Sequence, residues 1–461
     1  MKKLFYILFF FLPIAGFAQL NLYKDSPLDY EWKYVGTAGF STENALFTSL
    51  AFNSSGQPYV AFKDFEYSDK ASVMKFDGTN WNYVGSAGFS AGEVFEIKLE
   101  FNPSDGQPYV AYDDNGNAHK ATVMKFDGTN WNNVGIAGFS AGEAYYICLA
   151  FNPLGEPYVG YSDYGNDEKE TVMKFDGINW INVGSPGFSA DGTQSASLAF
   201  SPAGDPYVAY ADLFKNSKAT VMKFDGINWV NIGNMGFTPG EADYISLAFN
   251  SSGEPYVAFE DWTNNYKASV MKFDGNNWIY IGKGGFSTGH VLYVSLAFNF
   301  EDQPYVAYAD GSVFYSCSVM KFDGNDWINV GNNGFSGNNS LFTSLAFSSD
   351  NKPYVAFIDF ENASKVTVMK YDSVFVGINE HQPSQFSLYP NPVATKLTID
   401  FKNLPGIMDC FDITDIRGMK MTEAHSSEKK IILDIESYPA GIYIIILKMD
   451  NSVYIRKFCK N

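Results

Sequence analysis

The chain is built from short runs in which hydrophobic and polar positions alternate, and turn residues separate the runs. Within residues 241–283 four runs follow one another, at 244–250, 255–261, 268–274 and 278–282. A period of two predicts β-strands, and the Gly and Asn residues between the runs predict tight turns. The second run, PYVAFED, is apolar on both faces, as expected of a central strand. The pattern therefore predicts a unit of four strands.

This unit recurs seven times, and its landmarks step along the chain by 49 or 50 residues. The most visible landmark is the Trp that opens the fourth strand. These tryptophans are Trp32, Trp81, Trp131, Trp180, Trp229, Trp278 and Trp327. Four strands in such a unit are typical of a β-propeller blade, whereas helical repeats need a hydrophobic period of 3.6.

The two ends of the repeat region complement each other. Residues 30–36 form a Trp-containing strand with no unit before it, and the last unit ends without such a strand. Pairing the two ends would remove a free sheet edge. We therefore predict an all-β fold: a seven-bladed β-propeller of four-stranded blades over residues 30–378, with the N-terminal strand closing the last blade.

The repeated residues have a structural interpretation. Asp-Gly favours a tight hairpin, the Asp accepts hydrogen bonds from its own turn amides, and the Trp packs one blade on the next. Through Asp77, Gly78 and Trp81 the blade resembles kelch-type and Asp-box propeller blades. The full Asp-box pattern has one residue between Asp and Gly, and here there is none. The resemblance implies a fold and no reaction.

The composition changes after the repeats. Residues 379–386 form a polar linker, and the alternating runs in 387–461 predict a small β-sandwich. This segment resembles the type A C-terminal sorting domain of the type IX (Por) secretion system of Bacteroidetes. The matching landmarks are Tyr389-Pro390-Asn391-Pro392, Leu397-Thr398-Ile399, Gly418, Pro439-Ala440-Gly441-Ile442-Tyr443, and the basic end with Arg456, Lys457 and Lys460. The resemblance implies that the partner is the secretion machinery, which exports the protein and removes this domain, often with attachment to surface lipopolysaccharide.

The N-terminus has the pattern of a secretory signal peptide at residues 1–18. Lys2 and Lys3 precede an apolar stretch, and Gly16-Phe17-Ala18 suits cleavage before Gln19. The apolar stretch is too short to span a bilayer, and no later segment is long enough. The expected location is secreted or on the outer cell surface.

Charge and composition exclude several functions. The net charge of −19 argues against nucleic-acid binding. No arginine precedes Arg417, which excludes a site that clamps an anionic sugar with several arginines, as in sialidases. Cys148 and Cys317 lie in apolar runs and are expected to be buried, whereas pairing of Cys410 with Cys459 stays open.

Motifs for catalysis and metal binding are weak. G-x-S-x-G occurs around Ser90, Ser140 and Ser287, but between strands rather than before a helix, so no catalytic residue is predicted. No zinc spacing occurs, and no cofactor is predicted. Calcium is the alternative, at the oxygen-rich loops 113–117 and 163–168, which we interpret as solvated turns.

An aspartate also ends the second strand of every unit. These residues are Asp64, Asp114, Asp163, Asp212, Asp261, Asp310 and Asp359. They are expected to ring one face of the propeller, where each caps loop amides or pairs with a lysine such as Lys75.

Candidate ligand-binding residues lie where the repeats differ. The first strand of the second unit reads FEIKLEF, and alternation places its three charges on one side of the strand. Five of the other six units carry an aromatic residue at the Glu96 position, and the sixth carries Ser195. The loops after the second strands are also rich in aromatics. Aromatic rings beside acidic and amide groups suit sugars or extended peptides. The candidates are Glu96, Lys98, Glu100, Tyr146, Tyr244, Tyr293 and Trp262.

Three hypotheses follow. The first is a secreted or cell-surface, non-catalytic propeller that binds a glycan or a protein partner. The second is a polysaccharide lyase or hydrolase that uses Glu96, Lys98 and Glu100 at the channel mouth. The third is a structural adhesin without a small-molecule site.

Overall fold

The computed structural model describes residues 30–373, 386–400, 410–415, 420–424, 430–449 and 452–461. The predicted signal peptide at 1–18 and residues 379–385 of the predicted linker lie outside the described residues. The chain divides into two compact units, one up to residue 374 and one from residue 375.

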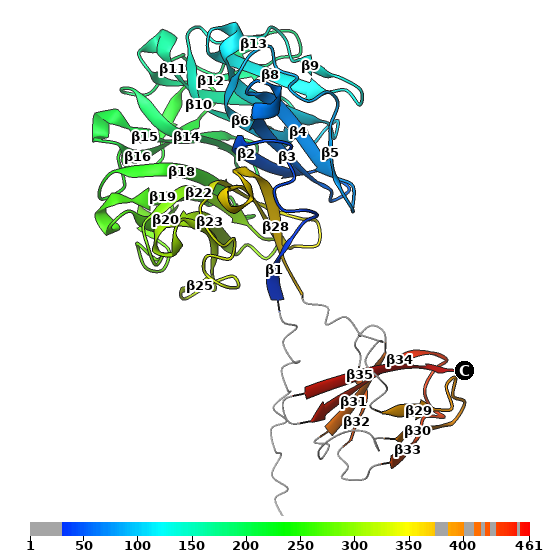
Figure 1. The fold of residues 1–461 in the computed structure, drawn as a ribbon. Coiled ribbons are helices and arrows are strands. Elements are labelled where there is room, and N and C mark those ends of the chain that lie inside the picture. Colours follow the sequence, from blue (N-terminus) through cyan, green and yellow to red (C-terminus); the bar gives the residue numbers. More distant parts are fainter. Residues whose placement is uncertain (1–29, 374–385, 401–409, 416–419, 425–429, 450–451) are drawn as a thin grey trace, which may run out of the picture. The chain divides into compact units, whose positions relative to one another are not determined.

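The first unit contains seven four-stranded antiparallel sheets, numbered here as blades 1 to 7 (Figure 1). Blade 1 comprises β2 (Ala45–Phe52), β3 (Pro58–Asp64), β4 (Lys70–Phe76) and β5 (Trp81–Tyr83). Blade 2 comprises β6 (Val94–Phe101), β7 (Pro108–Asp114), β8 (Lys120–Phe126) and β9 (Trp131–Asn133). Blade 3 comprises β10 (Ala144–Phe151), β11 (Pro157–Asp163), β12 (Lys169–Phe175) and β13 (Trp180–Asn182). Blade 4 comprises β14 (Thr193–Phe200), β15 (Pro206–Asp212), β16 (Lys218–Phe224) and β17 (Trp229–Asn231).

The remaining blades follow the same order. Blade 5 comprises β18 (Ala242–Phe249), β19 (Pro255–Asp261), β20 (Lys267–Phe273) and β21 (Trp278–Tyr280). Blade 6 comprises β22 (Val291–Phe298), β23 (Pro304–Asp310), β24 (Ser316–Phe322) and β25 (Trp327–Asn329). Blade 7 comprises β26 (Ser340–Phe347), β27 (Pro353–Asp359), β28 (Lys365–Ser373) and β1 (Tyr30–Tyr34).

A short 3₁₀ turn follows the second strand of every blade. These turns are η1 (Phe65–Tyr67), η2 (Asn115–Asn117), η3 (Tyr164–Asn166), η4 (Leu213–Lys215), η5 (Trp262–Asn264), η6 (Gly311–Val313) and η7 (Phe360–Asn362). Because the strands are antiparallel, all seven turns lie on one face of the ring, which we call the η face. The hairpin turns lie on the opposite face, which we call the turn face.

The ring closes on itself. β1 pairs with β28 in antiparallel register, from Tyr30 opposite Ser373 to Tyr34 opposite Met369 (Figure 1). The first strand of each blade packs against the first strand of the next, and β26 packs against β2. The predicted closure by the N-terminal strand is confirmed, and the architecture is a propeller-like ring whose first strands are innermost.

The repeated Trp and Asp-Gly residues hold the blades as predicted. Trp81 donates its indole N–H to the carbonyl oxygen of Val35 in the preceding seam at 2.7 Å, and its ring stacks on Phe40 with centroids 4.1 Å apart. Asp77 accepts hydrogen bonds from two turn amides at 2.8 Å. Gly78 has φ of 103°, which a side chain would disfavour.

The aspartates that end the second strands are not on the surface. Asp261 is fully buried and accepts hydrogen bonds from Thr263 N and from the Ser269 hydroxyl. The other six are likewise buried N-caps of their 3₁₀ turns. The capping interpretation is confirmed. All seven begin the turns of one face, as predicted, but they are buried there. The alternative of pairing with Lys75 is wrong, because Lys75 lies opposite Tyr59 at the far end of the strand pair.

The serines of the G-x-S-x-G motifs are also structural. Ser90 is buried, accepts a hydrogen bond from Ala71 N and donates one to Gly92 O at 2.6 Å. Ser140 and Ser287 make the corresponding bonds. Cys148 and Cys317 are buried, as predicted, and Cys459 is a free cysteine.

The second unit contains two sheets. One comprises β29 (Ser387–Tyr389), β30 (Lys396–Asp400) and β33 (Lys430–Asp434). The other comprises β31 (Cys410–Asp415), β32 (Lys420–Ala424), β34 (Gly441–Met449) and β35 (Ser452–Lys460). Side chains of both sheets share one core, including Leu397, Ile399, Phe411, Ile445 and Phe458. Within the described ranges, no helix is long and apolar enough to cross a membrane.

Candidate functional site

A β-bulge interrupts the first strand of every blade near the η face. In β18, for example, the register shifts between Asp243 and Ser246. The residue inside the bulge has a positive φ between 48° and 57° in all seven blades. We call these residues the bulge ring: Phe47, Glu96, Tyr146, Ser195, Tyr244, Tyr293 and Phe342. A left-handed backbone costs a residue with a side chain about 1–2 kcal/mol, and such strain concentrates at functional sites.

Four members of the bulge ring form a continuous aromatic arc. Ring centroids are 5.0 Å apart for Tyr244 and Tyr293, 4.4 Å for Tyr293 and Phe342, and 4.8 Å for Phe342 and Phe47. All four side chains are half-buried. Because they come from consecutive innermost strands, they lie side by side around the axis of the ring at its η-face end, and the term central opening refers here to this axis.

The other side of the opening is polar. The Glu96 carboxylate accepts a hydrogen bond from Ile147 N in the next blade at 3.1 Å, and burial raises the pKa of Glu96. The Ser195 hydroxyl donates to the Asp243 carboxylate, which also accepts from Tyr244 N. The bulge ring is therefore divided into an aromatic arc and a polar arc of Glu96, Tyr146 and Ser195.

Lys98 and Glu100 follow on the innermost strand of blade 2. Both side chains are exposed. Desolvation raises the pKa of Glu100 to about 7, and the nearby Lys98 ammonium opposes that rise. In blade 1 the position of Lys98 is Ser49, whose hydroxyl accepts from Leu99 N. The strand register shifts between Phe95 and Lys98, so side chains do not alternate regularly from Glu96 to Lys98. The prediction that regular alternation places Glu96, Lys98 and Glu100 on one side of the strand therefore does not apply to Glu96.

Trp262 lies apart from the bulge ring. It begins η5 on the η face, its side chain is 42% exposed, and its ring packs against Tyr266 at 5.0 Å. Of the seven candidates, the structure thus brings Glu96, Tyr146, Tyr244 and Tyr293 into one ring. It places Lys98 and Glu100 further along the same opening.

Two titratable pairs on the η face were missed by sequence reasoning. The His119 Nδ1 atom is 3.0 Å from the carboxylate of buried Asp113, whose pKa desolvation raises to about 6. Glu260 lies opposite Asp243 in the strand register, and desolvation together with that acid raises its pKa to about 7. Asp113 and Glu260 occupy one repeat position that is Ala or Ile in three blades, and this variation was the available signal.

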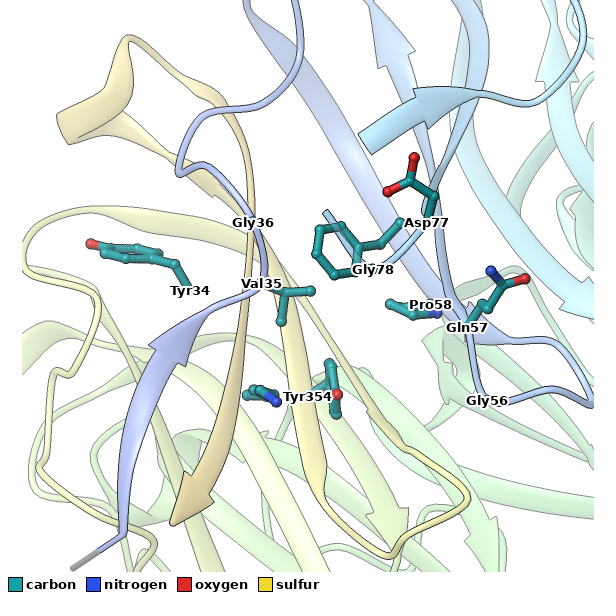
Figure 2. Close-up of a pocket in the computed structure, with 11 residues that line it drawn as sticks. Tyr34, Val35, Gly36, Gly56, Gln57, Pro58, Asp77, Gly78 and Tyr354 are labelled. Atoms are coloured by element: carbon teal, nitrogen blue, oxygen red, sulfur yellow. The ribbon is translucent and has the colours of Figure 1, made fainter. Parts of the chain in front are cut away.

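The turn face carries grooves at the seams between blades. Figure 2 shows the groove at the closure of the ring, a cavity of about 380 Å³. Val35 of the closing segment and Tyr354 line one wall, and Pro58 and Asp77 of blade 1 line the other. A cavity of about 430 Å³ occupies the equivalent place between blades 2 and 3.

No cluster of three or more His, Cys, Asp or Glu side chains suited to a metal ion occurs among the residues that the structure describes. In the two loops considered for calcium, Asp114 and Asp163 are occupied as caps, each accepting from a turn amide and a threonine hydroxyl.

Solved structures similar to this chain include several kinds of protein. PorZ, a surface component of the type-IX secretion system of Porphyromonas gingivalis, is 14% identical with a TM-score of 0.46, over 91% of this chain and 60% of its own. A lectin from Aleuria aurantia is 16% identical with a TM-score of 0.45, over 64% of this chain and 96% of its own. A PL25 ulvan lyase is 11% identical with a TM-score of 0.48, over 74% of this chain and 95% of its own. Likenesses at this level leave binding and catalysis undecided.

No curated protein sequence matches the chain. The family model described as "Secretion system C-terminal sorting domain" matches residues 387–461, the segment whose sequence landmarks indicated that family. Residues 387–461 are therefore a C-terminal sorting domain of the type IX secretion system, and the chain is a protein exported to the cell surface or the surroundings.

Proposed function

We propose that the exported propeller-like unit is a non-catalytic binding module that holds a glycan or protein partner at the bulge ring. The observation that carries the proposal is the set of seven left-handed bulges. Each keeps a side chain at the central opening despite the backbone strain. The bulge also forms around Glu96 and Ser195, so its conformation does not require a Tyr or Phe. Phe47, Tyr244 and Phe342 contribute to packing as well, since each lies against a hydrophobic core cluster.

The division of the bulge ring favours a neutral sugar chain. The aromatic arc offers ring faces to the apolar side of a pyranose, and the polar arc offers hydrogen-bond partners for hydroxyl groups.

The test is a glycan array probed with the full chain, followed by titration calorimetry with the best ligand. The double variant Tyr244→Ala/Tyr293→Ala should raise the dissociation constant at least about tenfold. That factor corresponds to the loss of a single binding anchor of roughly 1.4 kcal/mol, so it is a lower bound for two residues. Phe214→Ala is the matched control, because that ring is exposed on η4 of the same face and lies outside the bulge ring. An array without signal, or equal losses in both variants, would contradict the proposal.

A polysaccharide lyase or hydrolase is the second candidate. It is favoured by Glu100, whose pKa of about 7 suits a general acid or base at neutral pH. Against it, Glu96 is engaged with a backbone amide. Glu100→Gln would abolish polysaccharide breakdown if this candidate were correct, and activity that survives the substitution would exclude Glu100 from catalysis.

The finer features of the fold belong to the same proposal. The blades are of the kelch-like or Asp-box-like type, in which the Asp-Gly turn and the Trp hold each blade against the next. The two sheets of residues 387–461 fit a small β-sandwich. A structural adhesin without a small-molecule site is the outcome if neither glycans nor polysaccharide substrates engage the bulge ring.

A further inference from the structure

Blade 5 carries two acids on the η face that no cation of the described chain neutralises. Asp243 on β18 and Glu260 on β19 lie opposite each other in the strand register, so their side chains lie on the same side of the sheet. Glu260 is 6% exposed, and its carboxyl group makes no hydrogen bond or ion pair with any residue that the structure describes. A buried acid without a partner is costly to keep in a fold.

The repeat position of Glu260 is polar in three other blades, and each time it has a protein partner. Lys63 pairs with the Glu93 carboxylate, Asp113 lies 3.0 Å from His119 Nδ1, and Ser162 donates to Glu168 O at 2.8 Å. In blade 5 the two partner positions hold His290 and Tyr266. His290 is hydrogen-bonded to the Tyr315 hydroxyl, and the Tyr266 ring packs against Trp262. Among the described residues, Glu260 is thus the one polar side chain at this position that lacks a partner.

The two acids lie beside the aromatic arc. The Asp243 carboxylate accepts hydrogen bonds from the Ser195 hydroxyl and from Tyr244 N, the latter at 2.7 Å. Tyr244 follows Asp243 directly in the chain, and its ring lies 5.0 Å from that of Tyr293. Burial raises the pKa of Tyr244, and the charges of Asp243 and Glu260 add to the rise. The acids therefore act on the arc at the end that adjoins the polar arc.

The charges around this end of the aromatic arc are negative. Burial raises the pKa of Tyr146 in the polar arc, and the acids Glu96 and Asp243 raise it further. Lys98 is the cation that acts on the polar arc, where it opposes the pKa rise of Glu96. The pKa of Glu260, in contrast, is raised to about 7 by burial and by Asp243.

The basic residues of blade 5 and of the adjoining loop do not compensate the two acids. Ala268 is the residue opposite Glu260 on β20, so the preceding Lys267 has its side chain on the other side of the sheet. His290 is engaged with a tyrosine hydroxyl, as described above. A cation that neutralises Asp243 and Glu260 must therefore come from a bound molecule.

We propose that Asp243 and Glu260 form an ammonium site, which binds the free amino group of an amino sugar in the glycan held by the bulge ring. The inference rests on the proposed function, because Tyr244 belongs to the aromatic arc and adjoins the acids. An ammonium group has three donors for carboxylate oxygens, and a nearby tyrosine ring attracts its charge. The amino group of such a sugar is attached directly to the pyranose ring. Stacking on Tyr244 and pairing with its neighbour Asp243 can therefore occur within one sugar unit, and the rest of the chain stays neutral.

The test compares tetrasaccharides of β-1,4-linked N-acetylglucosamine that differ at one sugar unit. That unit is glucosamine, N-acetylglucosamine or glucose, and it is placed at each position in turn. At neutral pH the full chain should bind the best glucosamine-bearing ligand about tenfold or more tightly than both neutral counterparts, as expected for charge-assisted hydrogen bonds. The two neutral ligands differ in size, so they separate an effect of charge from an effect of the missing acetyl group.

Glu260→Gln keeps the shape of the side chain and should remove most of the preference for the amine. Asp243→Asn is the second variant, because it keeps an acceptor for the Ser195 hydroxyl and should also reduce the preference. Glu66→Gln is the matched control: Glu66 is an exposed acid of η1 on the same face, and its replacement changes the net charge by the same amount. That variant should keep the preference.

Equal binding of the three kinds of ligand by the wild-type chain would overturn the ammonium site and leave the proposed function standing. A preference that survives both Glu260→Gln and Asp243→Asn would do the same. An equal loss of preference in Glu66→Gln would also overturn it, since the attraction would then come from the net charge of −19. Absence of binding to all of these ligands overturns the ammonium site as well, whereas the proposed function is decided separately by the complete glycan array.

Discussion

A buried glutamate gives the fold a pH dependence that can be calculated. Glu170 on β12 is fully buried at a repeat position that is Ala in blades 1, 2, 4 and 5. Gly160 makes room for it, since a Cβ there would lie 3.3 Å from the Glu170 carboxyl and 2.9 Å from the Cys148 sulfur. One carboxyl oxygen accepts from the Thr193 hydroxyl at 2.9 Å, and the other has no partner.

Burial raises the pKa of Glu170 from 4.5 to about 8. Between these two values the folded chain keeps a proton that the unfolded chain releases, so stability must fall as the pH rises. The loss is absent below pH 4.5 and complete above pH 8. From pH 5 to pH 8 it amounts to about 3 kcal/mol, at 1.36 kcal/mol for each pH unit.

Glu170→Gln removes the titration and keeps the shape of the side chain. Between pH 5 and pH 8 the melting midpoint of the wild-type chain should therefore fall by about 4–5 °C more than that of the variant. The figure takes an unfolding entropy of roughly 2 cal/mol/K for each residue of the propeller-like unit. Calorimetric scans of both proteins across this range measure the difference in slope. Comparing slopes cancels the pH-independent cost of burying the amide and the titration of other carboxyls. Parallel pH profiles for the two proteins would refute the reasoning.

Three further predictions concern closure, capping and the central opening. Trp32→Ala should lower the free energy of unfolding by about 3–5 kcal/mol, because the indole is buried between the closing strand and blade 6 and donates a hydrogen bond to Val330 O. As a control, Glu31→Ala should change the denaturation midpoint little, because Glu31 is exposed. Asp261→Ala should lower the free energy of unfolding by about 1–3 kcal/mol, because the hydroxyls of Ser269 and Tyr280 lose their acceptor. Amide hydrogen exchange should become faster in η5, whose Thr263 N–H donates to Asp261. The Glu100 carboxyl should titrate near pH 7 by ¹³C NMR, and Lys98→Met should raise that midpoint because the ammonium favours the ionised form.

The ring was predictable because its determinants are local and repeated. The repeated Trp makes the contacts between neighbouring blades. The Asp-Gly pair forms the hairpin turns. The strand at residues 30–36 pairs with β28 and closes the ring. The bulges were not predicted, since Tyr, Phe and Glu are residue types that seldom adopt positive φ. A signal was present nonetheless: the apolar positions Val94, Ile97 and Leu99, which are buried, are spaced by three and then two residues, which a regular strand does not produce.

The burial of the aspartates that end the second strands was not predicted, for a different reason. A charged residue after an apolar strand suggests the surface, and its burial depends on partners further along the chain. Asp261 is satisfied by Ser269, eight residues later, and by Tyr280 on the fourth strand. The Ser or Thr at this distance recurs in every blade and was the readable sign of a buried cap.

The central claim is that the bulge ring holds the ligand. It is tested most directly by a crystal structure of the exported chain with the strongest ligand from the glycan array. The account predicts a sugar ring stacked on Tyr244 or Tyr293 in the opening of the η face. A ligand bound elsewhere on the ring, with the aromatic arc empty, would contradict it.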